Sequence, residues 1–97
     1  MQTKPVVLPE SVADASDIVF ITAVDGRVHR SLFEKIAKFG KPVFIDKPFV
    51  CAVEDATAIL ETARSQAIPV MSCSSLRYAE NFQAELAKSV DEFGKIV

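Results

Sequence analysis

The stretch from Pro42 to Phe49, PVFIDKPF, ends an apolar segment on a charged pair. Four apolar residues lead into Asp46, Lys47 and Pro48, so a segment with the pattern of a buried strand carries an acid and a lysine at its end. A strand that serves only a core is expected to stop on a turn signal such as Asn-Gly or Asp-Gly. A fixed ammonium there can favour a developing alkoxide and hold two reactants in line. Lys47 is therefore the first candidate for a functional residue.

Two further apolar segments end in small, polar or cationic residues. The first segment ends in Ala23–Gly26, the second in Asp46–Pro48, and the third in Ser72–Ser75 with Arg77 just beyond. If the three strands are parallel, their carboxyl ends share one edge of a sheet, which is where α/β sheets bind ligands. We therefore expect a ligand site at that edge.

The spacing of apolar residues predicts strands that alternate with amphipathic helices. The segments 18–23, 42–47 and 69–76 have the near-continuous apolar pattern of parallel strands covered on both faces. Gly40 and Gly94 are expected to end the first and third helices. The helical positions are Val28, Leu32, Ile36 and Phe39, then Val53, Ala56, Ile59, Leu60 and Ala63, then Tyr78, Phe82, Leu86, Val90 and Phe93. The order predicts an α/β fold, βαβαβα, with a parallel sheet and right-handed crossovers.

The N-terminal segment 1–17 is interpreted as a lead-in to one domain formed by residues 18–97. Val6–Leu8 is too short to be more than a candidate strand, and Pro9–Ala15 is long enough for one helical turn. Asp25 and Gly26 together predict a cap and turn before the first helix.

The composition is that of a small globular domain. The chain has 97 residues, of which 49% are hydrophobic and 25% charged, and a formal net charge of −2, which gives no electrostatic case for binding nucleic acid or an anionic membrane. No apolar run approaches the roughly 20 residues that span a bilayer, and the N-terminus lacks the apolar part of a signal peptide, so we expect a cytoplasmic protein. Cys51 and Cys73 predict reduced thiols, and neither a metal site nor a disulfide framework is indicated.

These residues, taken in order, resemble the second half of the cofactor domain of the Gfo/Idh/MocA (glucose-fructose oxidoreductase and inositol dehydrogenase) family, from about Asp17 to Val97. The most specific part is the motif G-K-x-V-x-x-(E/D)-K-P, here Gly40–Pro48, with His29 about one helix upstream. The resemblance implies a three-layer half-Rossmann domain in an enzyme that uses NAD or NADP to move a hydride to or from a hydroxyl carbon of a sugar, a polyol or a related compound.

The resemblance also implies roles for individual residues. Lys47 would reach toward the nicotinamide ribose and the substrate hydroxyl, as the catalytic residue. Pro48 would place it, in a Lys-Pro bond that is often cis in this family. Asp46, where the family more often has Glu, would orient Lys47 or pair with a nearby cation, or be a plain surface acid.

Further residues at the predicted edge would line the cofactor groove: Ala23, Asp25, Gly26, His29 and Arg77. Each has a simpler alternative. Asp25 and Gly26 would serve equally as a helix cap, His29 as a packing or capping group, and Arg77 as a solvent-exposed cation. Where the family has Thr or Ser before the second helix, this chain has Cys51 and Ala52, so a cap is expected to be absent there.

The sequence departs from the family in what it lacks. No G-x-G-x-x-G occurs, and Gly26, Gly40 and Gly94 are the only glycines, so the turn that would hold the cofactor pyrophosphate is missing. We expect an NAD(P)-dependent oxidoreductase fragment that lacks the first βαβ unit and the substrate domain, is inactive alone, and binds the cofactor weakly or not at all.

A non-catalytic module that binds to itself is the alternative. The strand predicted at residues 18–23 would lie at an open sheet edge, with neither lysine nor proline to interrupt pairing. A homodimer through this strand would complete a six-stranded sheet.

Overall fold

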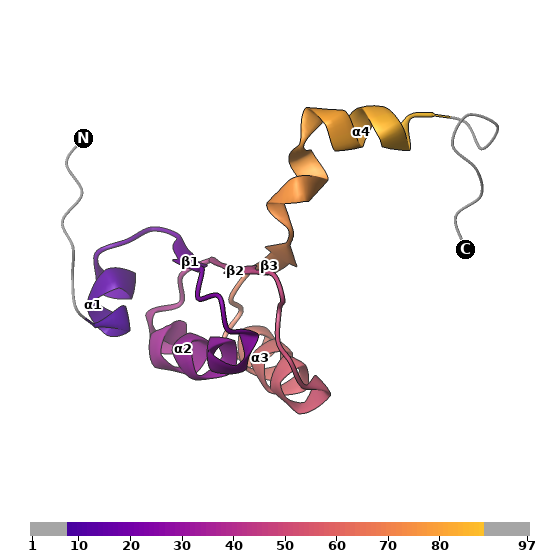
Figure 1. Cartoon of the computed structure of the whole chain (residues 1–97). Coiled ribbons are helices and arrows are strands. Elements are labelled where there is room, and N and C mark those ends of the chain that lie inside the picture. The colour runs from indigo at the N-terminus through magenta and orange to yellow at the C-terminus, as the bar shows by residue number, and fades with distance from the viewer. Residues whose placement is uncertain (1–7, 89–97) are drawn as a thin grey trace.

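The computed structural model describes residues 8–88 of the chain, and Figure 1 shows their arrangement. The strands and α-helices, in chain order, are α1 (Pro9–Asp14), β1 (Val19–Ile21), α2 (His29–Ile36), β2 (Val43–Asp46), α3 (Val53–Ser65), β3 (Val70–Cys73) and α4 (Glu80–Leu86). Short 3-10 helices lie at Gly26–Val28, Ala37–Phe39 and Ser75–Tyr78. The predicted alternation of strand and helix is confirmed. The candidate strand positions Val6 and Val7 and the helical positions Val90 and Phe93 lie outside the described residues.

The three strands form one parallel sheet in the order β1-β2-β3. Ile21 of β1 is opposite Ile45 of β2, and Asp46 of β2 is opposite Cys73 of β3. The strands therefore end at nearly the same level, and the α/β fold of a Rossmann-like half domain is confirmed.

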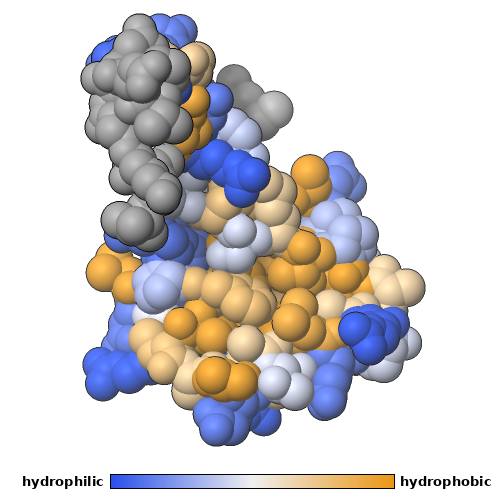
Figure 2. Space-filling view, turned by 90° about the vertical axis from the view of Figure 1, so that its right-hand side faces the viewer, coloured by the Kyte–Doolittle hydropathy of each residue, from blue (hydrophilic) through white to orange (hydrophobic). Residues whose placement is uncertain are grey.

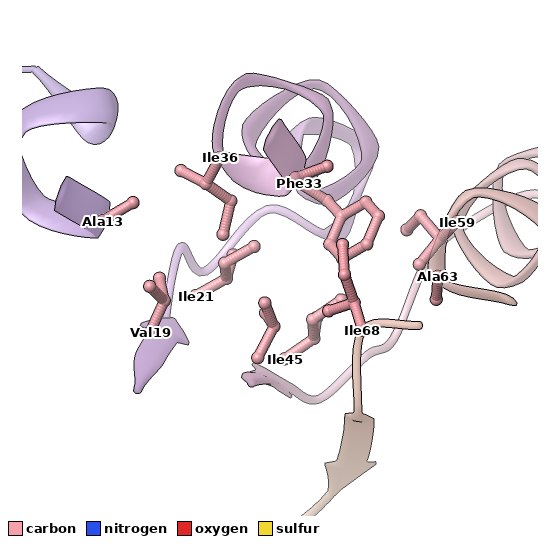
Figure 3. Close-up of a cluster of buried hydrophobic side chains, with 11 residues drawn as sticks. Ala13, Val19, Ile21, Phe33, Ile36, Ile45, Ile59, Ala63 and Ile68 are labelled. Carbon is pink, nitrogen blue, oxygen red and sulfur yellow. The ribbon is translucent and has the colours of Figure 1, made fainter. Parts of the chain in front are cut away.

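One face of the sheet forms the core with α2 and α3. Val19, Ile21, Val43 and Ile45 are at most 5% exposed and alternate with more exposed residues along β1 and β2. They meet side chains of both helices (Figure 3), among them Phe33, Ile36, Ile59 and Ala63. Each large apolar side chain buried in this way stabilises the fold by about 1.5–3 kcal/mol. The core thus fixes which face of each strand points inward.

The helix α1 adds a small contribution to the same core. Its Ala13 has no exposed surface and belongs to the core cluster, and the helix packs against α2. The helical turn expected within Pro9–Ala15 is therefore confirmed.

The opposite face of the sheet is open in the part of the chain that the structure describes. Phe20 is 64% exposed and Met71 48%, and the ring of Phe20 lies 5.5 Å from that of Phe44. The helix α4 projects away from the sheet in Figure 1, so it does not cover them. Figure 2 views the molecule from the β3 side and shows further hydrophobic surface on the body beneath α4. Residues 8–88 therefore contain two layers. The apolar run of each strand predicted that both faces of the sheet are covered. Such a run does not specify which part of a molecule covers the second face.

The ends of α2 and α3 show how the chain returns to the sheet. Gly40 has a φ of 66° after the 3-10 helix that extends α2, which is the left-handed conformation expected of a terminating glycine. After α3, the amide of Ile68 donates to the carbonyl of Ala63, and that of Ala67 to the carbonyl of Arg64. This is a Schellman motif in which Ala67, with a φ of 54°, occupies the left-handed position that glycine normally takes.

Replacing Ala67 with Gly should stabilise the domain. A left-handed alanine costs about 1–2 kcal/mol, whereas the added chain entropy of glycine offsets part of that gain, so we expect the free energy of unfolding to rise by about 0.5–1 kcal/mol. Urea denaturation measures it. The matched control is Ala58→Gly within α3, which should lower the free energy of unfolding by about 1 kcal/mol. A loss of stability in Ala67→Gly would contradict the assignment.

Candidate functional site

The carboxyl ends of the three strands meet at one edge of the sheet. The pairing of Ile21 with Ile45 and of Asp46 with Cys73 brings the segments that follow β1, β2 and β3 to the same level. The first of these segments, Thr22–Asp25, is called loop 1 below, and the second, Lys47–Ala52, loop 2. The predicted convergence of the strand ends is therefore confirmed.

Lys47 is the first residue of loop 2. Its backbone N–H donates a 2.9 Å hydrogen bond to Oδ1 of Asp46, and its side chain is exposed. No acid pairs with its ammonium among residues 8–88. The Lys47–Pro48 peptide bond is cis, which agrees with the conformation that the family resemblance implied. Asp46 thus holds the backbone of Lys47 and leaves the charge of its side chain free for another partner.

Asp25, at the end of loop 1, is bonded to Arg27. Its Oδ1 accepts from the backbone N–H and Nε of Arg27 at 2.9 Å, and its Oδ2 accepts from Nη2 at 2.6 Å. The side-chain and backbone hydrogen bonds from Arg27 lower the pKa of the Asp25 carboxyl from 3.8 to about 2. The predicted cap is confirmed, since this carboxylate caps the 3-10 helix Gly26–Val28. Both of its oxygens are already engaged within the chain.

His29 is the first residue of α2, close to the edge where the strands end, and has no exposed surface. Its Nε2 is 2.7 Å from the carbonyl oxygen of Ala23 in loop 1, and its Nδ1 is 3.0 Å from that of Phe49 in loop 2. The cofactor contact that the resemblance implied for His29 does not fit this burial. The imidazole instead lies between the two loops and contacts the backbone of both.

Gly26 marks a second close approach between the same segments. A Cβ atom at Gly26 would lie 2.8 Å from Cγ of Pro48, closer than real Cβ contacts come, and 3.0 Å from Sγ of Cys51, which is tighter than most. The residue that follows loop 1 therefore packs directly on loop 2, and a larger residue would require loop 2 to shift.

The third strand end contributes a groove between β3 and α4. Ser74 caps the 3-10 helix Ser75–Tyr78, with its hydroxyl accepting from the amide of Leu76 at 3.2 Å. The groove has a volume of about 620 Å³, and Arg77 lines it together with apolar residues of α4 such as Phe82. The side chain of Arg77 is exposed and its backbone carbonyl accepts from Nε2 of Gln83. Arg77 thus lies near the edge, on the β3 side.

Sequence reasoning missed two parts of this site. Arg27, which engages both oxygens of Asp25, follows the predicted cap by two residues, and an Asp-x-Arg spacing could have indicated the pair. The carbonyls of Ala23 and Phe49 could not have been found, because every residue has a carbonyl. The predicted absence of a side-chain cap at Ala52 is confirmed.

Comparison with protein families adds a finding that is independent of this geometry. A model of an oxidoreductase family with an NAD-binding Rossmann fold, GFO_IDH_MocA, matches residues 3–74, most of the 97-residue chain. The chain belongs to this family. The match confirms the resemblance indicated by the motif Gly40–Pro48, begins earlier than Asp17 and ends before Arg77. No curated protein gives a match to the chain.

Neither a membrane-spanning helix nor a metal site is seen in residues 8–88. No helix in this range is both long and apolar enough to cross a membrane. Nor do three or more His, Cys, Asp or Glu side chains in the range gather in a way that could hold a metal ion.

Replacing Arg27 with Gln should raise the pKa of Asp25 from about 2 toward 3.8, because the hydrogen bonds from the guanidinium are removed. A carbon NMR titration of the Asp25 carboxyl measures this. The lowered pKa means that the pair stabilises the folded chain above about pH 4 and that this stabilisation is lost as the pH falls toward 2. The unfolding free energy of Arg27→Gln should therefore depend less on pH in that window.

The matched control for this titration is Arg77→Gln, which removes an exposed cation without touching Asp25 and should leave its titration unchanged. An Asp25 midpoint near 3.8 in the unmodified chain would show that the pair does not form in solution.

Proposed function

We propose that this domain forms the nicotinamide side of an NAD(P)-dependent oxidoreductase that acts on a hydroxyl carbon of a sugar, a polyol or a related compound. The observation that carries the proposal is Lys47, an exposed ammonium without an acid partner among residues 8–88, placed at the ligand-binding edge of a parallel sheet. Family membership supports the cofactor class.

The chemistry of hydride transfer explains why a lysine suits this position. A bound nicotinamide would supply or accept the hydride, and the substrate oxygen would carry negative charge when the carbonyl is reduced or when the hydroxyl proton passes to water. An ammonium beside that oxygen stabilises the charge in the transition state. Lys47 is proposed in this catalytic role, with the backbone of loop 1 lining the nicotinamide ribose.

The residues of the chain fit one end of the cofactor better than the other. The edge offers a free cation and backbone groups for a ribose and its substrate. The sequence has no glycine-rich turn before a helix, which is the usual cradle of the pyrophosphate. We therefore propose a weak site for the nicotinamide ribose and no pyrophosphate site in this chain, which leaves NAD and NADP equally suitable.

The test is a titration of the chain with reduced nicotinamide mononucleotide, followed by amide shifts in NMR spectra. We expect shifts confined to loops 1 and 2, with a dissociation constant of about 1 mM or weaker because the ligand makes few contacts. NADH should bind no more than a few-fold tighter, since the chain lacks a pyrophosphate cradle. Lys47→Met should weaken the mononucleotide by about tenfold, the usual effect of losing one charged hydrogen bond.

The matched control is Lys41→Met, which removes a lysine at the other end of β2 and should leave binding unchanged. Low-micromolar binding of NADH would contradict the missing cradle, and equal binding by the Lys47 and Lys41 variants would contradict the role of Lys47.

A second candidate function is self-association without catalysis, with a second copy of the chain as the partner. Within residues 8–88, β1 is an edge strand of the sheet, and its Phe20 is 64% exposed whereas its Ile21 is 5% exposed. An unpaired strand edge beside exposed aromatic surface favours pairing with another strand. A two-fold axis parallel to β1 would give one continuous six-stranded sheet.

Light scattering after a sizing column should then give twice the monomer mass, and Phe20→Lys should give the monomer mass. The control is Val24→Lys, which changes a residue that is 94% exposed and lies beyond the strand, and should leave the dimer intact. A stable monomer at high micromolar concentration in the unmodified chain would refute this candidate.

A further inference from the structure

His29 is the one buried polar side chain in the part of the chain that the structure describes. It is the first residue of α2, and its ring nitrogens have no access to solvent because the residue has no exposed surface. Its two nitrogens instead face the carbonyl oxygens of Ala23, at 2.7 Å, and of Phe49, at 3.0 Å. A carbonyl oxygen can only accept, so each contact is a hydrogen bond only when the ring nitrogen that faces it carries a proton. A neutral imidazole donates to one loop, and a protonated imidazole donates to both.

The two carbonyls belong to the two loops that form the edge. Ala23 is two residues beyond the end of β1, and Phe49 is two residues beyond Lys47. A second contact lies just after loop 1, where the backbone of Gly26 packs on Pro48 and Cys51 of loop 2. The side chain of His29 and the backbone of Gly26 are therefore two contacts that connect the segment after β1 with loop 2.

The side chain of Lys47 depends on this arrangement for its direction. In residues 8–88 no hydrogen bond or ion pair of its ammonium is found, so the contacts that hold this residue are those of its backbone, which fixes where the side chain starts. On one side of Lys47, Asp46 Oδ1 holds its N–H at 2.9 Å. On the other side, His29 holds the carbonyl of Phe49. The backbone of Lys47 is thus held from both directions.

We propose that His29 is a positioning residue, which ties loop 1 to loop 2 and so aims Lys47 at the ligand. It acts on the ligand only through Lys47, because it has no exposed surface of its own. The inference rests on the proposed function for what Lys47 contacts, but the tie between the loops stands independently of any ligand.

The first measurement needs no ligand. In His29→Phe, which keeps a ring and removes both ring nitrogens, backbone order parameters in loops 1 and 2 should fall from about 0.85 to below about 0.6. The matched control is Phe33→Leu, a buried substitution on the same helix, which should lower stability and leave both loops ordered. Loops that stay ordered in His29→Phe would overturn the inference.

The second measurement is a double-mutant cycle on the binding of reduced nicotinamide mononucleotide. His29→Phe should weaken binding by about the same tenfold as Lys47→Met, and the double variant should bind no more weakly than either, because one residue acts through the other. A role in general stability would leave the affinity of the folded His29→Phe chain unchanged, and independent contacts would give multiplied losses. Either result overturns the positioning role.

The two measurements separate this inference from the proposed function. If Lys47→Met leaves binding unchanged while the loops of His29→Phe lose order, the proposed function is wrong, but the tie that His29 makes between the two loops is supported. If His29→Phe does not fold, His29→Leu decides, since it also removes both ring nitrogens and leaves a smaller apolar side chain in their place. Ordered loops and unchanged affinity in that variant would overturn the inference.

Discussion

A buried imidazole between two backbone carbonyls is the interaction on which the geometry of the edge depends. His29 reaches Ala23 at 2.7 Å and Phe49 at 3.0 Å from a position with no exposed surface. Hydrogen bonds in such a water-free place are strong, and an unpaired polar group there would be costly. A side chain of α2 therefore lies between the two loops and contacts the backbone of both.

The sheet and its helices provide the frame for that contact. Parallel pairing of β1, β2 and β3 brings the strand ends to one edge, and Phe33 and Ile59 hold α2 and α3 against one face. His29 begins α2, so the packing that places this helix also places the imidazole under the loops. The core packing therefore places α2 and its His29, His29 contacts the two loops, and loop 2 begins with Lys47, whose ammonium has no acid partner among residues 8–88.

Much of the fold could be predicted because it follows from local pattern. The apolar runs and helical spacing gave the strand and helix order, Gly40 marked a helix end, and the motif ending in Lys47–Pro48 indicated the family. The open face of the sheet could not be predicted, because an apolar strand residue such as Phe20 looks the same whether or not something covers it. A packing role for His29 was one of the predicted alternatives and agrees with its burial. Its two partners could not be predicted, since they are backbone carbonyls that leave no trace in residue type.

The central claim is that Lys47 faces the nicotinamide ribose from a position fixed by its two loops. A crystal structure of the chain soaked with reduced nicotinamide mononucleotide tests it most directly. The account predicts that a ribose hydroxyl lies within hydrogen-bonding distance of Lys47 Nζ, with the nicotinamide ring over the ends of β1 and β2. A mononucleotide bound on the open face beside Phe20, or at the edge without contact to Lys47, would contradict it.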